Sequence, residues 1–72
     1  MVNTELLKEK IKASGLKIEY IAEQLGVSRQ SFYNKANNRV EFTSSEVVTV
    51  CNILSITKLT EKETIFFAKE VT

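Results

Sequence analysis

The sequence predicts a single all-α domain, residues 1–72, built from five short helices. Its 72 residues include no proline and only two glycines, whereas a sheet with many hairpins needs more of both. Apolar residues recur three and four positions apart along most of the chain, which is the spacing of one helix face. Side chains that cap helices stand directly before several of these apolar stretches. A chain of this length forms one small domain.

The first helix is expected over residues 4–14. Asn3 or Thr4 is its N-cap, and Gly15 follows its last turn, where a glycine commonly ends a helix. The positions that share its inner face are Leu7, Ile11 and Ser14. The lysines of this stretch then point away from the core.

A helix-turn-helix is expected over residues 18–36. Gly26 separates a helix over residues 18–25 from a helix that begins after the N-cap Ser28. Because so few residues join them, the two helices must cross at a steep angle, and Ala22 leaves the space that the crossing needs. The apolar positions of the pair are Ile18, Ile21, Ala22, Leu25, Val27 and Phe32. The outward side of the second helix of the pair carries Arg29, Gln30, Tyr33 and Asn34.

The fourth helix is expected over about residues 44–54. Thr43 and Glu46 have the spacing of a capping box at its start. The residues of its buried stripe are Val47, Val50, Cys51 and Leu54. Cys51 is the only cysteine, and we expect it to pack as a small buried hydrophobe.

The fifth helix is expected over about residues 61–71, where Thr60 and Glu63 have the spacing of a second capping box. Ile65 and Phe66 project to the outer side of this helix. There they either widen the packing stripe or meet a second subunit or a partner protein. The residues expected on its inner side are Thr64, Phe67, Ala68 and Val71.

The residue types that the chain lacks exclude most catalytic chemistry. It has no histidine, no aspartate and one cysteine, so neither a Ser-His-Asp nor a Cys-His arrangement can form. No metal-ligand cluster is expected either. We therefore expect no enzyme, no cofactor and no small-molecule substrate. No apolar run approaches the roughly 18 residues that span a bilayer, and the amino-terminal stretch lacks the apolar segment of a signal peptide, so we expect a cytoplasmic protein without membrane contact.

Positive charge is concentrated in the first part of the sequence. The net charge is only +1, yet residues 1–40 carry seven lysines and arginines against four glutamates. Residues 41–72 carry three lysines against five glutamates. Residues 27–40 contain three cations and no acid. A polyanion would therefore be attracted to this segment first.

The stretch IEYIAEQLGVSRQSFYNKANN, residues 18–38, resembles the helix-turn-helix of the lambda-repressor-like family, the Cro and XRE type. Three further features point to a smaller group within this family: the later segments EFTSSEV and ETIFFAKEV, and the short length of the chain. They are similar to those of small single-domain regulators from temperate phages of Gram-positive bacteria. That group includes Cro-like proteins and antirepressors of the modulator-of-repression type. The resemblance covers essentially the whole chain.

The resemblance implies a five-helix domain whose third helix enters the major groove of operator DNA, usually as half of a dimer. The residues matched to base-reading positions are Arg29, Gln30, Asn34 and Tyr33; Arg can bond guanine, and Gln or Asn can bond adenine. The residues matched to phosphate contacts are Lys17, Ser28, Ser31, Lys35 and Arg39. Ile18 stands where many family members have a glutamine that reaches a phosphate. Lys35 stands where an apolar residue is common, so its stem is expected to lie along the protein with the amine reaching outward.

Two functions fit these expectations. The first is a phage-type transcriptional regulator of the lysis/lysogeny switch, which binds operator DNA as a homodimer in the cytoplasm of the bacterial host. The second is an antirepressor that binds a phage repressor in a heterocomplex and blocks its DNA-binding surface. The polar outward side of the third helix favours the first function. The low net charge, Ile18 and the surplus apolar surface of the fifth helix favour the second.

Overall fold

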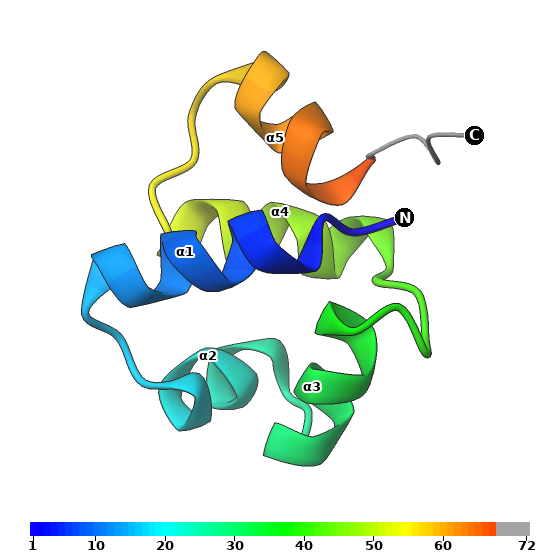
Figure 1. Ribbon diagram of the computed structural model, residues 1–72. Coiled ribbons are helices and arrows are strands. Elements are labelled where there is room, and N and C mark those ends of the chain that lie inside the picture. The colour runs from blue at the N-terminus through cyan, green and yellow to red at the C-terminus, as the bar shows by residue number, and fades with distance from the viewer. Residues whose placement is uncertain (68–72) are drawn as a thin grey trace.

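The computed structural model describes residues 1–67, which form five α-helices and no β-strand. In chain order the helices are α1 (Thr4–Ser14), α2 (Ile18–Leu25), α3 (Arg29–Ala36), α4 (Ser44–Ile53) and α5 (Leu59–Phe66). In the view of Figure 1, α5 lies above α1 and α4, and α2 and α3 lie below them. The all-helical class predicted from the sequence is confirmed for this part of the chain. None of its helices has both the length and the apolar character needed to cross a membrane.

Polar side chains fix where three of the helices begin. Asn3 caps α1, and Ser28 caps α3; in each case the side-chain oxygen accepts a hydrogen bond from a backbone N–H of the first turn. Thr43 and Glu46 form a reciprocal capping box at the start of α4. These three starts confirm the boundaries predicted from the sequence.

Glycines end α1 and α2. Gly15 and Gly26 both have a φ of 74°, in the left-handed region where a side chain would be strained. The N–H of Gly26 donates to the Glu23 carbonyl, and the chain turns from α2 into α3 within residues 26–28. Ser14, expected on the inner face of α1, is exposed because the last turn of α1 extends beyond the core.

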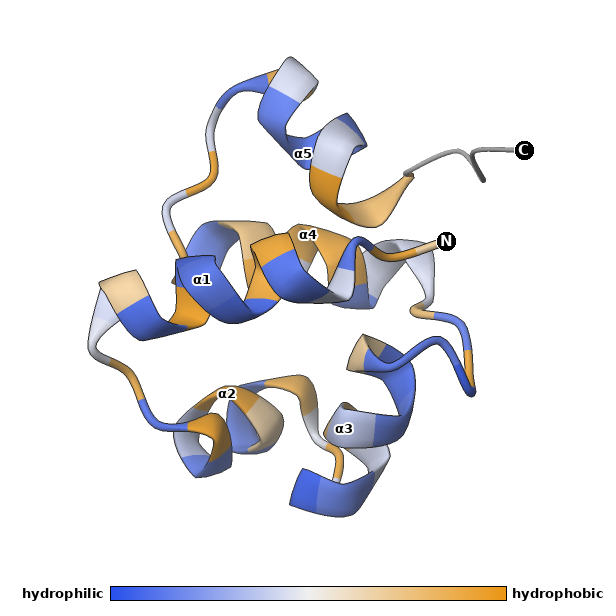
Figure 2. Ribbon diagram, in the orientation of Figure 1, coloured by the Kyte–Doolittle hydropathy of each residue, from blue (hydrophilic) through white to orange (hydrophobic). Residues whose placement is uncertain are grey.

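The core is continuous through all five helices. Its buried residues are Val2, Leu7, Ile11, Ile21, Ala22, Phe32, Ala36, Val47, Val50, Cys51, Ile56, Ile65 and Phe66. The ring of Phe42 meets Phe32 and Phe66 edge-on, with centroids 6.0 Å and 5.6 Å apart. Figure 2 shows the apolar sides of the helices turned toward one another. Cys51 is buried as expected, and this burial raises the pKa of its thiol, which favours the protonated form.

The phase of α5 differs from the sequence prediction. The helix begins at Leu59 after Lys58, and no side chain caps it, so the capping box predicted at Thr60 is wrong. Ile65 and Phe66 are 0% and 4% exposed and belong to the core, so the packing alternative is confirmed for them and the candidate protein interface at these two residues is wrong. The reason is that Phe66 packs on Phe42 while the Ile65 carbonyl accepts a hydrogen bond from the backbone of Asn3.

Phe67 and Thr64 are exposed instead, although both were expected on the inner side of α5. Phe67 is 57% exposed and Leu59 67% exposed. Ala68, Val71 and the predicted continuation of the helix to residue 71 lie outside the described residues. The described exposed apolar surface of α5 is therefore at Leu59 and Phe67.

The segment before α1 is tied to the end of α3 by polar contacts. The Asn38 side chain pairs with the backbone of Val2, accepting from its N–H at 2.7 Å and donating to its carbonyl at 2.9 Å. The Thr4 hydroxyl donates to the Ala36 carbonyl at 2.6 Å. Asn38 itself has a φ of 64°, which asparagine tolerates better than most residues. One side chain thus joins two segments far apart in the sequence.

Replacing Asn38 with alanine should lower the free energy of unfolding by about 1–3 kcal/mol. The variant loses two hydrogen bonds and places a Cβ without a compensating polar group in the left-handed region. Urea or thermal denaturation followed by circular dichroism measures the change. Asn38→Gly is the matched control, because it loses the same hydrogen bonds without the backbone strain. Its free energy of unfolding should therefore fall by less than that of Asn38→Ala. Unchanged stability of both variants would show that the Asn38–Val2 pairing does not hold the amino-terminal segment.

Candidate nucleic-acid interface

The orientation of α3 is set by two buried residues one helical turn apart. Phe32 is 1% exposed, and Ala36 is also buried in the core. At about 100° per residue, Gln30 and Asn34 then point outward, while Arg29 and Tyr33 flank the side toward α2. Arg29, Gln30 and Tyr33 are exposed, and Asn34 is half-buried. The structure thus brings the four predicted base-reading residues together on the outer part of one short helix.

The two amide side chains of this surface contact each other. Gln30 Nε2 donates to Asn34 Oδ1 at 3.2 Å across one helical turn. The Gln30 oxygen and the Asn34 amide nitrogen are not used in this bond. One acceptor and one donor of the pair can therefore face a ligand, which is the combination that the major-groove edge of adenine requires.

Arg29 forms an ion pair with Glu19 of α2. Arg29 Nη1 lies 2.8 Å from Glu19 Oε1, and the two side chains are 60% and 71% exposed. Such an exposed pair contributes at most about 1 kcal/mol, so an incoming ligand can break it at little cost. The guanidinium has five N–H donors, and the contact with Glu19 uses one of its nitrogens. Sequence reasoning missed Glu19 as part of this site.

Lys35, predicted as a phosphate contact, points to α4 instead of outward. Its amine lies 2.7 Å from Glu46 Oε1, and both side chains are only 13% exposed. The expectation that the amine reaches outward is wrong, because Lys35 sits about 60° round the helix from Phe32, on the flank that faces Glu46 of α4. Lys35 and Glu46 therefore form a structural pair beneath the surface of α3.

The Glu46 carboxyl carries several interactions at once. Burial alone would raise its pKa, but hydrogen bonds from Lys35 and from the backbone and hydroxyl of Thr43, together with the Lys35 charge, outweigh burial and lower the pKa. Glu46 Oε1 also accepts the Thr43 backbone N–H at 2.8 Å. One carboxylate thus caps α4 and fixes Lys35 of α3.

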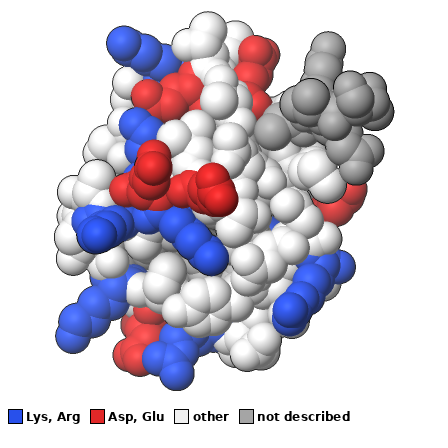
Figure 3. Space-filling model, in the orientation of Figure 1, with Lys and Arg blue, Asp and Glu red and all other residues white. Residues whose placement is uncertain are grey.

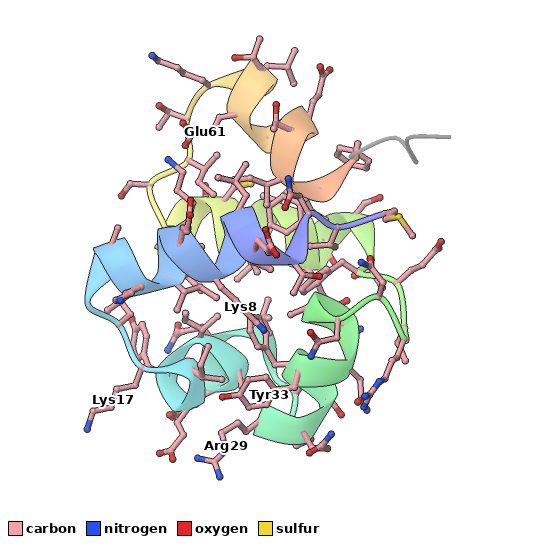
Figure 4. All side chains as sticks on the ribbon, viewed as in Figure 1. Lys8, Lys17, Arg29, Tyr33 and Glu61 are labelled. Atoms are coloured by element: carbon pink, nitrogen blue, oxygen red, sulfur yellow. The ribbon has the colours of Figure 1, made fainter. Side chains whose placement is uncertain are left out.

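The remaining predicted phosphate contacts lie around α3. The hydroxyls of Ser28 and Ser31 are hydrogen-bonded at 3.0 Å at its amino-terminal end. Lys17 is exposed at the start of α2 and points away from the body of the protein (Figure 4). Arg39 is exposed in the turn after α3. Figure 1 shows this turn leaving α3 at the right of the view, whereas Figure 4 labels Lys17 at the left. Cations thus lie on both sides of α3.

A hollow of about 250 Å³ lies beside α3, between α1 and α2. It is lined by Lys8, Ile11, Lys12, Ile18 and Tyr33. Lys8 extends from α1 toward the ring of Tyr33 (Figure 4). Lys8 and Lys12 were not predicted as part of this site. Their spacing of four residues places them on one face of a helix, but it does not show which other element that face contacts.

The charges on the visible face are unevenly distributed. Figure 3 shows most of the lysine and arginine atoms from the middle of the view downward, over α1, α2 and α3, and most of the acidic atoms at the middle or higher up. The acidic group at the lower edge lies directly beside a basic one. The end of the molecule that carries α3 is therefore the more attractive one to a polyanion.

Comparison of the chain with protein-family models, curated proteins and solved structures gives no match. Within residues 1–67, no group of three or more His, Cys, Asp or Glu side chains is placed to hold a metal ion. The chemistry of the site is therefore that of exposed arginine, lysine, amide, hydroxyl and phenol groups.

The Lys35–Glu46 pair should make stability depend on pH. Because the folded-state pKa of Glu46 is lowered, its stabilising contribution is present above the unfolded-state pKa and is lost as the pH falls through the folded-state value. Glu46→Gln keeps an oxygen that can cap Thr43 but removes the charge. It should cost about 1–3 kcal/mol at neutral pH.

Denaturation curves between about pH 7 and pH 3 test this expectation. The difference between the natural protein and Glu46→Gln should shrink as the pH falls. Glu46→Gln combined with Lys35→Met should recover most of the loss at neutral pH, because the unpaired cation is gone. A difference that stays constant with pH would contradict an ionic role for Glu46.

Proposed function

We propose that this protein is a DNA-binding regulator whose α2 and α3 act as a helix-turn-helix, with α3 entering the major groove. The observation that carries the proposal is the division of α3 into a buried face, with Phe32 and Ala36, and an exposed surface with Arg29 and Gln30. A helix with this division can be inserted into a groove without disturbing the core. The resemblance to temperate-phage regulators supports a role in the lysis/lysogeny switch.

The cations around α3 support the same proposal. A helix in the major groove lies between two phosphate backbones. Lys17 stands on one side of α3 and Arg39 on the other, and both are exposed. The serine hydroxyls at the amino-terminal end of α3 are further groups that can bond phosphate. On a two-fold operator a homodimer would present two such helices about one helical turn of DNA apart.

Selection from a random-sequence DNA duplex library tests the proposal. The protein should enrich one sequence, and Arg29→Ala and Gln30→Ala should each weaken binding to it by roughly 5- to 150-fold. Each variant should also relax the preference at one base pair. The matched control is Asn52→Ala, which removes an exposed amide from α4 and should bind normally. Unchanged melting temperatures would show that the variants are folded; enrichment of no sequence would contradict DNA reading.

The Arg29–Glu19 pair generates a second prediction on the same duplex. Glu19→Gln should tighten binding by roughly 2- to 10-fold, because it removes a negative charge that faces the DNA and competes for Arg29. Glu63→Gln in α5 makes the same charge change at the other end of the molecule and should have little effect. Weaker binding by Glu19→Gln would show that the carboxylate instead holds the guanidinium in its base-reading position.

An antirepressor is the second candidate function, and one observation favours it. Two cations matched to DNA-contacting positions, Arg29 and Lys35, are paired with glutamates of the protein itself. If the protein acts in this way, it enriches no DNA sequence alone and forms a 1:1 complex with a phage repressor. A gel shift on the DNA flanking its gene, with and without that repressor, distinguishes the two functions.

A further inference from the structure

We propose that Lys8 and Lys12 of α1 bind backbone phosphates of the DNA strand that borders the α1–α2 side of α3. The inference rests on the proposed DNA-binding function and extends the contact surface to a helix outside the α2–α3 pair. Both residues line the hollow beside Tyr33, and both are exposed. Within residues 1–67, neither lysine forms an ion pair with an acidic side chain.

The lysines of α1 are divided between two sides of the helix. Lys10 lies 2.9 Å from Glu61 of α5, so its charge is neutralised across the α1–α5 contact. Lys8 and Lys12 lie four residues apart on the side that meets α2 and α3. In Figure 4, Glu61 lies above α1 whereas Lys8 extends downward to Tyr33. Two of the three charges are therefore directed to the end of the molecule that carries the base-reading surface.

The hollow explains how a lysine from α1 can reach that surface. Ile11, Ile18 and Tyr33 give it an apolar lining. Lysine stems can lie on such a lining while their amines remain in water near its rim. The Tyr33 ring, 39% exposed, joins the hollow to the outer part of α3. Lys8 and Lys12 thus lie at the edge of the hollow beside Tyr33 of α3, on the side where we expect the DNA backbone next to an occupied major groove to pass.

The position of Ile18 supports a phosphate role for these lysines. Ile18 opens α2 and lines the same hollow, and its side chain offers no hydrogen bond to a phosphate. Among the predicted phosphate contacts, Lys17 is the one charged residue on this flank. Lys8 and Lys12 supply two more positive charges around the apolar residue. Phosphate contacts from α1 would therefore anchor the flank where α2 contributes least.

The salt dependence of binding measures these contacts directly. Each neutralised phosphate contributes about 0.9 to the slope of log K against log salt concentration. On the duplex enriched by the natural protein, Lys8→Gln combined with Lys12→Gln should reduce the magnitude of this slope by about 2, and each single variant by about 1. When salt rises from about 50 to 200 mM, the double variant should lose roughly tenfold less affinity than the natural protein. Its base preference should not change, because phosphate contacts carry no sequence information directly.

The matched control is Lys58→Gln combined with Lys62→Gln. It removes the same charge from the end of the molecule that carries α5, where both residues line a different groove. This control should leave the slope within about 0.5 of the natural value. A methylphosphonate scan then locates the contacts: neutralising the phosphates bound by Lys8 and Lys12 should weaken the natural protein but not the double variant. Arg39→Gln should instead lose sensitivity at phosphates of the opposite strand.

The possible outcomes distinguish a failure of the α1 phosphate contact from a failure of the proposed function. If the natural protein binds its enriched duplex and the double variant keeps the full slope, the α1 contact is wrong and the proposed function stands. If the α5 control lowers the slope as much as the α1 variant, overall charge explains the effect and the α1 contact is again wrong. If the natural protein enriches no duplex, the proposed function fails and the inference fails with it. Normal melting curves establish that the substitutions leave the fold intact.

Discussion

The burial of Phe32 is the constraint on which the arrangement of this protein depends. The ring lies at the meeting point of α3 with the rest of the core and contacts Phe42 edge-on, which in turn contacts Phe66 of α5. Because a helix has a fixed angular spacing, placing Phe32 and Ala36 inward decides where every other side chain of α3 points. Gln30 and Asn34 face outward, whereas Lys35 faces α4. The proposed base-reading surface is therefore a consequence of core packing.

Two glutamates, Glu46 and Glu19, each pair with a cation of α3 and so reduce the positive charge of this helix. Glu46 neutralises a lysine beneath the proposed base-reading surface in a largely buried pair, and Glu19 is paired with an arginine on that surface in an exposed pair. The difference in exposure matters, because the buried pair is costly to break and the exposed pair is not. Lys35 is thereby committed to the fold, while Arg29 stays available to a ligand. This division fits the proposed function, in which a protein of low net charge binds DNA through a small number of specific contacts.

The sequence predicted most of the helix boundaries that rest on a local signal, but the capping box expected at Thr60 and Glu63 was wrong. The caps at Asn3, Ser28 and Thr43 and the glycine at residue 26 are decided by interactions within a few residues, and the structure has them all. The prediction of which side of α5 is buried was wrong. Packing partners far away in the sequence, such as Phe42, decide which residues of α5 are buried, and the spacing within the helix does not show this.

The candidate site could also be predicted only where its residues lie on a single helix. The residues of one face of α3 could be grouped from the sequence, whereas the partners Glu19, Glu46 and Lys8 come from other helices. Lys35 is the instructive case: its angular distance from Phe32 could have been calculated, but only the fold shows that α4 and Glu46 occupy that direction.

Solution NMR of the isotope-labelled protein, titrated with a duplex enriched from the random library, tests most directly whether α3 is the DNA-contacting element. The largest changes in backbone amide shifts should fall in residues 28–34, with side-chain changes at Arg29 and Gln30 and smaller shifts in α1. Shifts confined to α4 and α5, with α3 unchanged at saturation, would contradict insertion of this helix into DNA.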